Sequence, residues 1–218
     1  MNKPFAVFDM DGTLVDSMVY WQRLGWEYLA SRGVTGGVDE VLERIKAMTM
    51  AESSALFIET FGLPGTPETV EAEMNAVMDG HYRSDIPLKP GAADYLALLK
   101  ARGTKMCVAP ATPEPLARAC LKRRGVLEDF AFLLSCDEVA AGKDRPDVFF
   151  EAARRLGSAP AETAAFEDAL FAARTAKDAG FYTVGVYDAS GDGHWNELTA
   201  LADETVRDWS AAAERMKI

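Results

Sequence analysis

Short apolar runs alternate with helical patterns along most of this chain, and this alternation restricts the folds that it can adopt. The runs that predict buried strands cover residues 5–8, 105–109, 131–135, 164–166 and 183–187. Glycine residues end several of the helical patterns between them, as expected where a helix stops. Strands separated by helices favour an α/β fold with a Rossmann-like parallel sheet core.

A stretch of helical patterns without strands separates the first predicted strand from the second. Apolar residues recur there at helical spacing, for example at Leu24 and Tyr28. We therefore expect an all-helical cap domain at residues 17–86, inserted into a core formed by residues 1–16 and 87–218. Because two short connections join these parts, the cap is expected to move as a lid.

The size and composition of the chain argue against several classes of protein. Its 218 residues suffice for one sizeable core with a smaller domain, and 49% hydrophobic with 26% charged residues is typical of a globular protein. No apolar run approaches the roughly 18 residues of a membrane span. The net charge of −11 disfavours nucleic acid and anionic lipid as partners. The 3 cysteines lack metal-ligand spacing, so we expect buried thiols in a cytoplasmic protein.

Acidic residues follow the first predicted strand, at the edge where parallel sheets bind their ligands. Asp9 and Asp11 lie there, and Gly12 permits the sharp turn that comes next. Such carboxylates can bind a divalent cation, and one of them can attack phosphorus while the other protonates a leaving oxygen. Taken alone, these residues are explained equally well by a solvated turn.

Further charged residues are expected at the same edge of the sheet. Lys143 lies downstream of the third predicted strand, and Glu167 and Asp168 end the fourth. A single loop lysine is usually a solvated surface charge. In combination, a lysine that reaches a phosphate and paired carboxylates that complete a metal shell are the groups that phosphoryl transfer requires.

Three motifs in this order resemble those of the haloacid dehalogenase superfamily. They are DMDGTLVDS at residues 9–17, GKDRPDVF at residues 142–149 and FEDALFAARTAKDAG at residues 166–180. The resemblance extends over nearly the whole chain. It is to the branch that carries a helical cap after the first motif and that includes phosphoglycolate phosphatase and β-phosphoglucomutase.

The resemblance implies a role for each of the charged residues. Asp9 is the expected nucleophile and a magnesium ligand. Asp11 is the expected general acid and base, and it also offers its backbone carbonyl to the Mg²⁺ ion. Asp168 is expected to bind the metal, with Glu167 supporting or joining its shell. Lys143 is expected to hold the phosphoryl group and Asp9 together electrostatically.

The second motif of the family differs in this chain. Relatives carry Thr or Ser after the second strand, where the hydroxyl binds phosphate, whereas this chain has Pro110. Proline offers neither a hydroxyl nor an N–H group. Ala111 and Thr112 are expected to bind the phosphate instead. Thr112 is the expected N-cap of the next helix, with Pro113 at its first position and free N–H groups facing the anion.

These features predict a magnesium-dependent phosphatase that hydrolyses a small phosphate monoester through an aspartyl-phosphate intermediate. A sugar phosphate or a phosphoglycolate-like compound is the expected substrate. Dehalogenases and phosphonatases of the superfamily lack an acid at the position of Asp11, so its presence favours phosphate esters.

Two alternatives stay open at this point. One is a phosphotransferase like β-phosphoglucomutase, which shares both aspartates. That mutase carries an arginine for a second phosphate where this chain has Met50, within the segment KAMTMAES at residues 46–53. The other is a catalytically impaired, ligand-binding relative, which Pro110 suggests. Removing one phosphate donor typically costs only about a hundredfold to a thousandfold in rate, so the phosphatase is favoured.

Overall fold

The computed structural model describes residues 2–45 and 48–217. It contains two compact units, one formed by Met1–Met18 with Ile86–Ile218 and the other by Val19–Asp85. All strands found among the described residues belong to the first unit.

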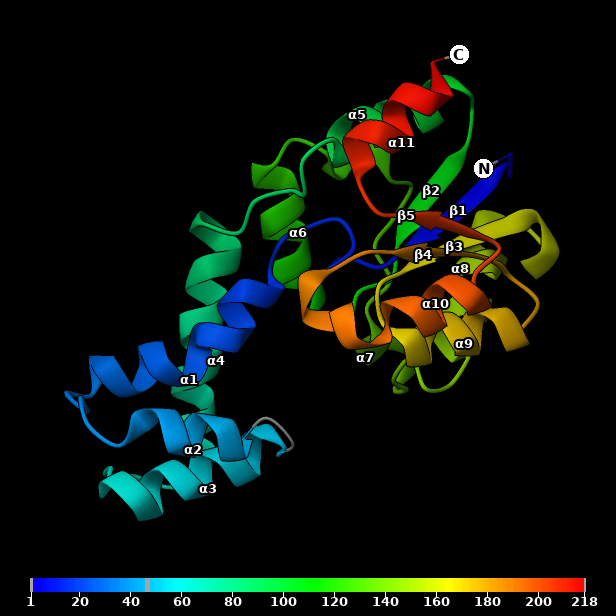
Figure 1. Ribbon diagram of the computed structural model, residues 1–218. Coiled ribbons are helices and arrows are strands. Elements are labelled where there is room, and N and C mark those ends of the chain that lie inside the picture. Colours follow the sequence, from blue (N-terminus) through cyan, green and yellow to red (C-terminus); the bar gives the residue numbers. More distant parts are fainter. Residues whose placement is uncertain (1, 46–47, 218) are drawn as a thin grey trace. The chain divides into compact units, whose positions relative to one another are not determined.

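The first unit is built on a sheet of five strands, in which each neighbouring pair is parallel. The strand order is β2-β1-β3-β4-β5 (Figure 1). The strands are β1 (Phe5–Phe8), β2 (Lys105–Val108), β3 (Thr163–Glu167), β4 (Tyr182–Val186) and β5 (Glu204–Val206). The predicted α/β fold with a parallel sheet is therefore confirmed.

Helices of this unit pack on both faces of the sheet (Figure 1). They are α5 (Ala92–Ala101), α6 (Glu114–Arg123), α7 (Cys136–Val139), α8 (Asp147–Leu156), α9 (Leu170–Asp178), α10 (Trp195–Leu201) and α11 (Trp209–Met216). Short 3-10 helices lie at η1 (Leu127–Asp129), η2 (Pro160–Glu162) and η3 (Ala189–His194).

Neighbouring side chains of a strand point to opposite faces of the sheet, so Val7 and Phe8 of β1 belong to different parts of the core. Phe8 stacks on Phe166 of β3, with ring centroids 4.2 Å apart, and it lies beside Trp209 of α11. Val7 belongs instead to the apolar cluster that contains Phe149 of α8. The sheet is therefore buried on both faces, which leaves its carboxyl edge as the place for polar chemistry.

Two details of the sheet differ from the sequence prediction. Residues 131–135 form no strand, because Leu133 makes only a single bridge to Val108 before Ser135 caps helix α7. The sequence pattern also does not reveal β5, which has three residues, of which only Val206 is buried.

The two connections to the helical unit pair with each other. The amide of Asp16 donates to the carbonyl oxygen of Pro87 at 2.9 Å, and the amide of Lys89 donates to that of Leu14 at 2.9 Å. An antiparallel bridge joins the residues between these bonds. The chain therefore leaves and re-enters the first unit through two adjacent, hydrogen-bonded segments.

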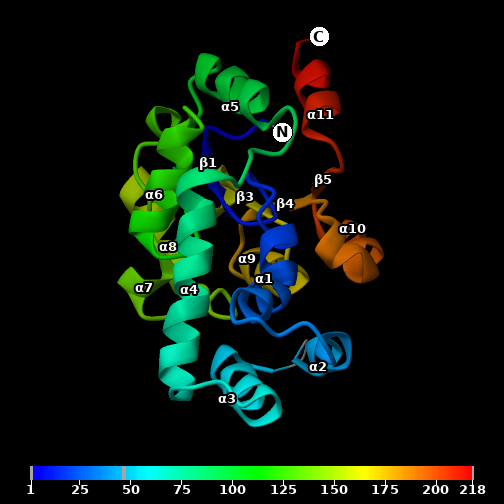
Figure 2. The same cartoon turned by 90° about the vertical axis from the view of Figure 1, so that its left-hand side faces the viewer.

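The insert between β1 and β2 is helical, as predicted. It consists of α1 (Met18–Ser31), α2 (Val38–Ile45), α3 (Met50–Phe61) and α4 (Pro67–Ser84). In both views α1 and α4 lie side by side (Figure 1 and Figure 2). The Tyr28 hydroxyl of α1 donates to the Glu73 carboxylate of α4 at 2.7 Å, and the Trp21 indole donates to the Tyr82 hydroxyl at 3.1 Å.

Some expectations from the sequence concern single residues of this scaffold. Residues 46 and 47 of the KAMTMAES segment lie outside the described residues, whereas Met50 is the first residue of α3 and follows its N-cap, Thr49. The cysteines Cys107, Cys120 and Cys136 are buried free thiols, as expected. No helix in the described part of the chain is long and apolar enough to span a membrane.

Candidate active site

Three carboxylates meet at the carboxyl edge of the sheet. Asp9 directly follows β1, Glu167 is the last residue of β3, and Asp168 comes next. The parallel register pairs Phe8 with Phe166, which places Asp9 beside Glu167. Oxygen atoms of the three carboxylates all lie within 4.8 Å of one another. We call Asp9, Glu167 and Asp168 the carboxylate cluster.

Lys143 lies against this cluster and is buried, with 5% of its side chain exposed. Its Nζ donates to Asp9 Oδ1 at 2.5 Å and to Glu167 Oε1 at 2.9 Å. Burial alone would lower the pKa of Lys143, but the charges of Asp9 and Glu167 raise it further than burial lowers it. The ammonium group therefore stays charged within the site, and Lys143 is no solvated surface lysine.

The turn after β1 leaves room for Asp168 because Gly12 has no side chain. A Cβ atom at Gly12 would lie 2.2 Å from Asp168 Oδ2, and the backbone has a φ of +80°. Thr13, the next residue, donates its hydroxyl to Asp168 Oδ1 at 3.3 Å. Glycine is therefore favoured at this position both by the positive φ and by the lack of space for a Cβ atom beside Asp168.

The donor atoms of the cluster fit a divalent cation. Asp9 Oδ2 is buried and has no hydrogen-bond partner among the described residues. Burial and, to a smaller extent, repulsion from Asp9 raise the pKa of Asp168 to about 7. A cation would relieve both causes, since carboxylate oxygens are the ligands that a hard ion such as Mg²⁺ prefers. Asp9, Glu167 and Asp168 therefore make up a suitable ligand set.

Asp11 takes part in a different set of contacts. Its carboxylate accepts a hydrogen bond from the Ser17 hydroxyl at 2.7 Å and from the Thr112 hydroxyl at 2.6 Å. Its side chain is not a member of the carboxylate cluster among the described residues. The arrangement leaves the carboxyl group of Asp11 fixed by two hydroxyls beside the turn that carries Asp9.

The loop after β2 differs from its prediction in two respects, both of which concern the start of helix α6. Helix α6 begins at Glu114 and has Pro113 as its N-cap, without a side-chain cap. The predictions of Thr112 as N-cap and of Pro113 as the first helical residue are therefore both wrong. The physical reason is that the backbone of Pro113 is not helical, with φ −52° and ψ +137°, so the helix starts one residue later than predicted. The Thr112 hydroxyl instead donates to Asp11. Ala111 is exposed and lines a surface pocket of about 440 Å³ that also includes Gly142, next to Lys143.

Two charged residues at this edge escaped the sequence analysis. Asp188 is buried just after β4, and its Oδ2 lies 2.8 Å from Lys89 Nζ. Burial alone would raise the pKa of Asp188, but hydrogen bonds from Lys89 and Ser190 lower it below the ordinary value. The rule that drew attention to Asp168, an acid after a strand, would also have found Asp188. Lys89 carries no comparable local signal.

Comparison with known proteins agrees with this geometry. The sequence model of the haloacid dehalogenase-like hydrolase family matches residues 5–180 of this chain. β-Phosphoglucomutase of Bacillus subtilis (strain 168) is 30% identical over 192 residues, which are 83% of this chain and 82% of that protein. Phosphoglycolate phosphatase of Shigella boydii is 28% identical over 203 residues, 83% of this chain and 80% of that protein.

The fold has solved relatives as well. The crystal structure of CbbY from Rhodobacter sphaeroides in complex with phosphate has a TM-score of 0.72, with 25% identity and 96% of each chain covered. This chain therefore belongs to the haloacid dehalogenase-like hydrolases. Within that family it is a phosphatase-type hydrolase of the branch related to β-phosphoglucomutase and phosphoglycolate phosphatase.

Proposed function

We propose that this chain is a magnesium-dependent phosphatase that hydrolyses a small phosphate monoester, either a sugar phosphate or a phosphoglycolate-like compound. The observation that carries the proposal is the environment of Asp9. One of its oxygens is held by Lys143, and the other is buried without a hydrogen-bond partner among the described residues. A buried carboxylate oxygen left in this way is suited to a cation or an electrophilic phosphorus.

In the first step, an Asp9 oxygen attacks phosphorus and forms an aspartyl-phosphate while the bond to the leaving oxygen breaks. The carboxyl group of Asp11 gives its proton to that oxygen. In the second step, water attacks the same phosphorus and Asp11 accepts the proton of the water. The bond between Asp9 and phosphorus breaks, and inorganic phosphate is released.

The remaining residues hold charge in place during both steps. The positive charge of Lys143 attracts both the phosphoryl oxygens and the Asp9 carboxylate, and it therefore holds these two anionic groups together. Asp9, the backbone carbonyl of Asp11, Glu167 and Asp168 would hold Mg²⁺, which supplies neutralising charge for the approach of two anions. Ala111 and Thr112 are proposed to contribute to phosphate binding.

Every residue of this mechanism lies outside the helical insert. We therefore propose that residues 1–16 and 87–218 form the catalytic domain and that residues 17–86 form a cap domain. In this proposal the cap domain sets substrate specificity, while the chemistry stays with the catalytic domain.

The test is hydrolysis of para-nitrophenyl phosphate with Mg²⁺, with excess EDTA, and by the Asp9→Asn variant. We expect turnover only with the cation and with Asp9 intact, because the amide of asparagine is not a nucleophile for phosphorus. Circular dichroism serves as the control for folding. Full activity in EDTA, or an active Asp9→Asn protein, would contradict the proposal. A panel of sugar phosphates and phosphoglycolate then identifies the substrate class.

The similarity to β-phosphoglucomutase favours one competing function, a phosphotransferase. Met50 offers an apolar side chain at the position compared with the mutase arginine, which argues against binding of a second phosphate. Incubation with β-glucose 1-phosphate separates the two: free phosphate supports the phosphatase, and glucose 6-phosphate supports the mutase. A protein that binds these compounds but converts none of them would be the impaired relative.

A further inference from the structure

An ion pair between a half-buried lysine and a buried aspartate lies next to the carboxylate cluster but outside it. Lys89 Nζ and Asp188 Oδ2 are 2.8 Å apart, and only 12% and 5% of the two side chains are exposed. Lys89 belongs to the segment that returns from the helical insert, and Asp188 follows β4. Neither residue has a part in the mechanism above.

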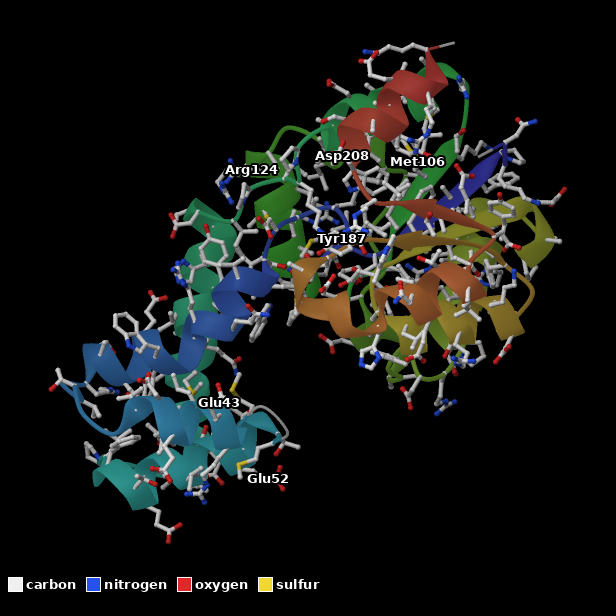
Figure 3. All side chains as sticks on the ribbon, viewed as in Figure 1. Glu43, Glu52, Met106, Arg124, Tyr187 and Asp208 are labelled. Atoms are coloured by element: carbon white, nitrogen blue, oxygen red, sulfur yellow. The ribbon has the colours of Figure 1, made fainter. Side chains whose placement is uncertain are left out.

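The pair is held firmly on both sides. Asp188 Oδ1 accepts the amide of Ser190 at 2.8 Å and its hydroxyl at 2.5 Å. Lys89 Nζ also donates to the carbonyl oxygen of Tyr187 at 2.7 Å, at the end of β4 where Figure 3 labels that residue. Both carboxylate oxygens of Asp188 therefore already have partners, which makes Asp188 a poor candidate for a direct metal ligand.

Asp188 is nevertheless electrostatically close to the cluster. The register pairs Glu167 of β3 with Gly185 of β4, so Asp168 and Asp188 both follow neighbouring strands at one edge of the sheet. The charges of Asp188 and Lys89 both act on Asp168, with opposite sign. Charges buried at this depth are only weakly screened by solvent ions.

We propose that Asp188 and Lys89 are positioning residues that set the affinity of the carboxylate cluster for its divalent cation without binding the cation themselves. The negative charge of Asp188 lies outside the ligand set and favours binding of the cation, whereas the positive charge of Lys89 opposes this effect. The inference rests on the proposed function, because it takes the cluster to be a metal site.

A role in cation affinity and a role in fold stability alone predict different effects of substitution on Mg²⁺ binding. If the two residues act through their charge, then removal of Asp188 weakens cation binding, whereas removal of Lys89 strengthens it. If the pair only stabilises the fold, the two single variants change cation binding in the same direction or leave it unchanged. Loss of both charges together should restore affinity, because the net charge is then unaltered.

The experiment is calorimetric titration of MgCl₂ into the full-length wild-type protein and into Asp188→Asn, Lys89→Met and the double variant. A unit charge acting at an effective dielectric constant of about 20 changes such an affinity by roughly tenfold. We expect a fall of about that size for Asp188→Asn, a rise of about that size for Lys89→Met, and a change within about twofold for the double variant. The Mn²⁺ electron paramagnetic resonance signal provides an independent readout.

The chain offers a matched control in Lys177 and Asp203. This pair is also a lysine and an aspartate, and Asp203 also binds β4, since its Oδ2 accepts the amide of Thr183 at 2.9 Å. That contact is at the opposite, amino-terminal end of the strand. Asp203→Asn should therefore leave Mg²⁺ affinity unchanged.

The possible results separate the inference from the proposed function. A wild-type protein that binds no Mg²⁺ would contradict the proposed function and the inference with it. If Asp188→Asn binds Mg²⁺ as tightly as the wild type, the inference is overturned but the proposed function is not. Equal losses of affinity in both single variants would have the same consequence. If Lys89→Met does not fold, because it leaves Asp188 buried without a counter-ion, the fall in Asp188→Asn and its reversal in the double variant decide the question.

Discussion

The hydroxyl of Thr112 donates to a carboxylate that lies 101 positions earlier in the chain, that of Asp11. In the proposed mechanism this carboxyl group must meet the leaving oxygen in one orientation. A hydroxyl that fixes it therefore contributes to catalysis through position, since small displacements of a proton donor are costly.

Thr112→Ala should lower kcat/KM by roughly tenfold or more, the loss expected when a charge-assisted hydrogen bond of about 1.5 to 3 kcal/mol is removed. Thr112→Ser keeps the hydroxyl and is the matched control, so its kinetics should stay close to those of the wild type. Steady-state kinetics with the best substrate of the panel checks both. Equal rates in a folded Thr112→Ala protein would show that the Thr112 hydroxyl is not needed to hold Asp11.

Gly12→Ala should destabilise the protein and weaken its Mg²⁺ binding. The added Cβ would meet Asp168 Oδ2 at 2.2 Å, and the positive φ of this residue is strained for alanine by about 1 to 2 kcal/mol. Gly33 has a nearly equal φ of +78° and nothing within 4 Å of a Cβ, so Gly33→Ala is the matched control. Denaturant unfolding and Mg²⁺ titration should show a strain cost in both variants but a loss of metal affinity only in Gly12→Ala.

Helices α1 and α4 of the insert are joined through His81 as well as through the hydroxyl of Tyr28. His81 Nε2 lies 3.0 Å from Glu27 of α1, and its Nδ1 lies 2.8 Å from Asp85, while Tyr20 lies against its ring. Burial alone would lower the pKa of His81, but the hydrogen bonds to Asp85 and Glu27 raise it above its ordinary value. The protonated form is therefore favoured in the folded insert.

Because the pKa of His81 is raised in the folded state, the direction in which pH changes the stability of the protein can be predicted. The stabilisation by His81 should be complete below its unfolded pKa of about 6.5 and should be lost as pH rises through the higher folded value. We expect the melting temperature of the wild type to exceed that of His81→Gln at pH 5.5, with the difference shrinking toward pH 8. A difference in melting temperature that stays constant between pH 5.5 and pH 8 would contradict this role of His81.

The elements were predictable where burial imposed a pattern on the sequence. β1, β2, β3 and β4 are continuous apolar runs because the sheet is covered on both faces. β5 and the single bridge at Leu133 lie at the margins of the sheet, where short segments need no such pattern. In the site, Asp9 and Asp168 directly follow strands and Glu167 ends one, so all three could be found from the strand ends. The contacts of Lys89 and Thr112 depend on tertiary folding, which leaves no local signal.

At the scale of the whole molecule, a carboxylate cluster that binds Mg²⁺ as proposed would make stability depend on the metal. The three acids gather in the folded chain and disperse on unfolding, so the native state should bind Mg²⁺ far better than the unfolded state does. Stability then rises with free Mg²⁺, by about 2.7 kcal/mol at a hundred times the dissociation constant.

Differential scanning calorimetry with and without Mg²⁺ should therefore show a higher melting temperature in the presence of the ion. If the two compact units melt separately, only the transition of the unit with the sheet should shift, because the cluster belongs to it. Asp168→Asn removes one ligand and should reduce the shift. A wild-type protein with identical transitions in Mg²⁺ and EDTA would show that the cluster binds no cation in the folded state.

The pairing of Asp16 with Pro87 and of Leu14 with Lys89 has a consequence for how such a chain can change over evolutionary time. Because the two segments already meet, the polypeptide between them begins and ends at neighbouring points, and its length imposes no strain on the sheet. The entropy of closing such a loop grows only slowly with its length, by about 0.6 kcal/mol for each doubling. We therefore expect that the insert can become longer or shorter, or be replaced by another segment, while the strand ends keep their spacing.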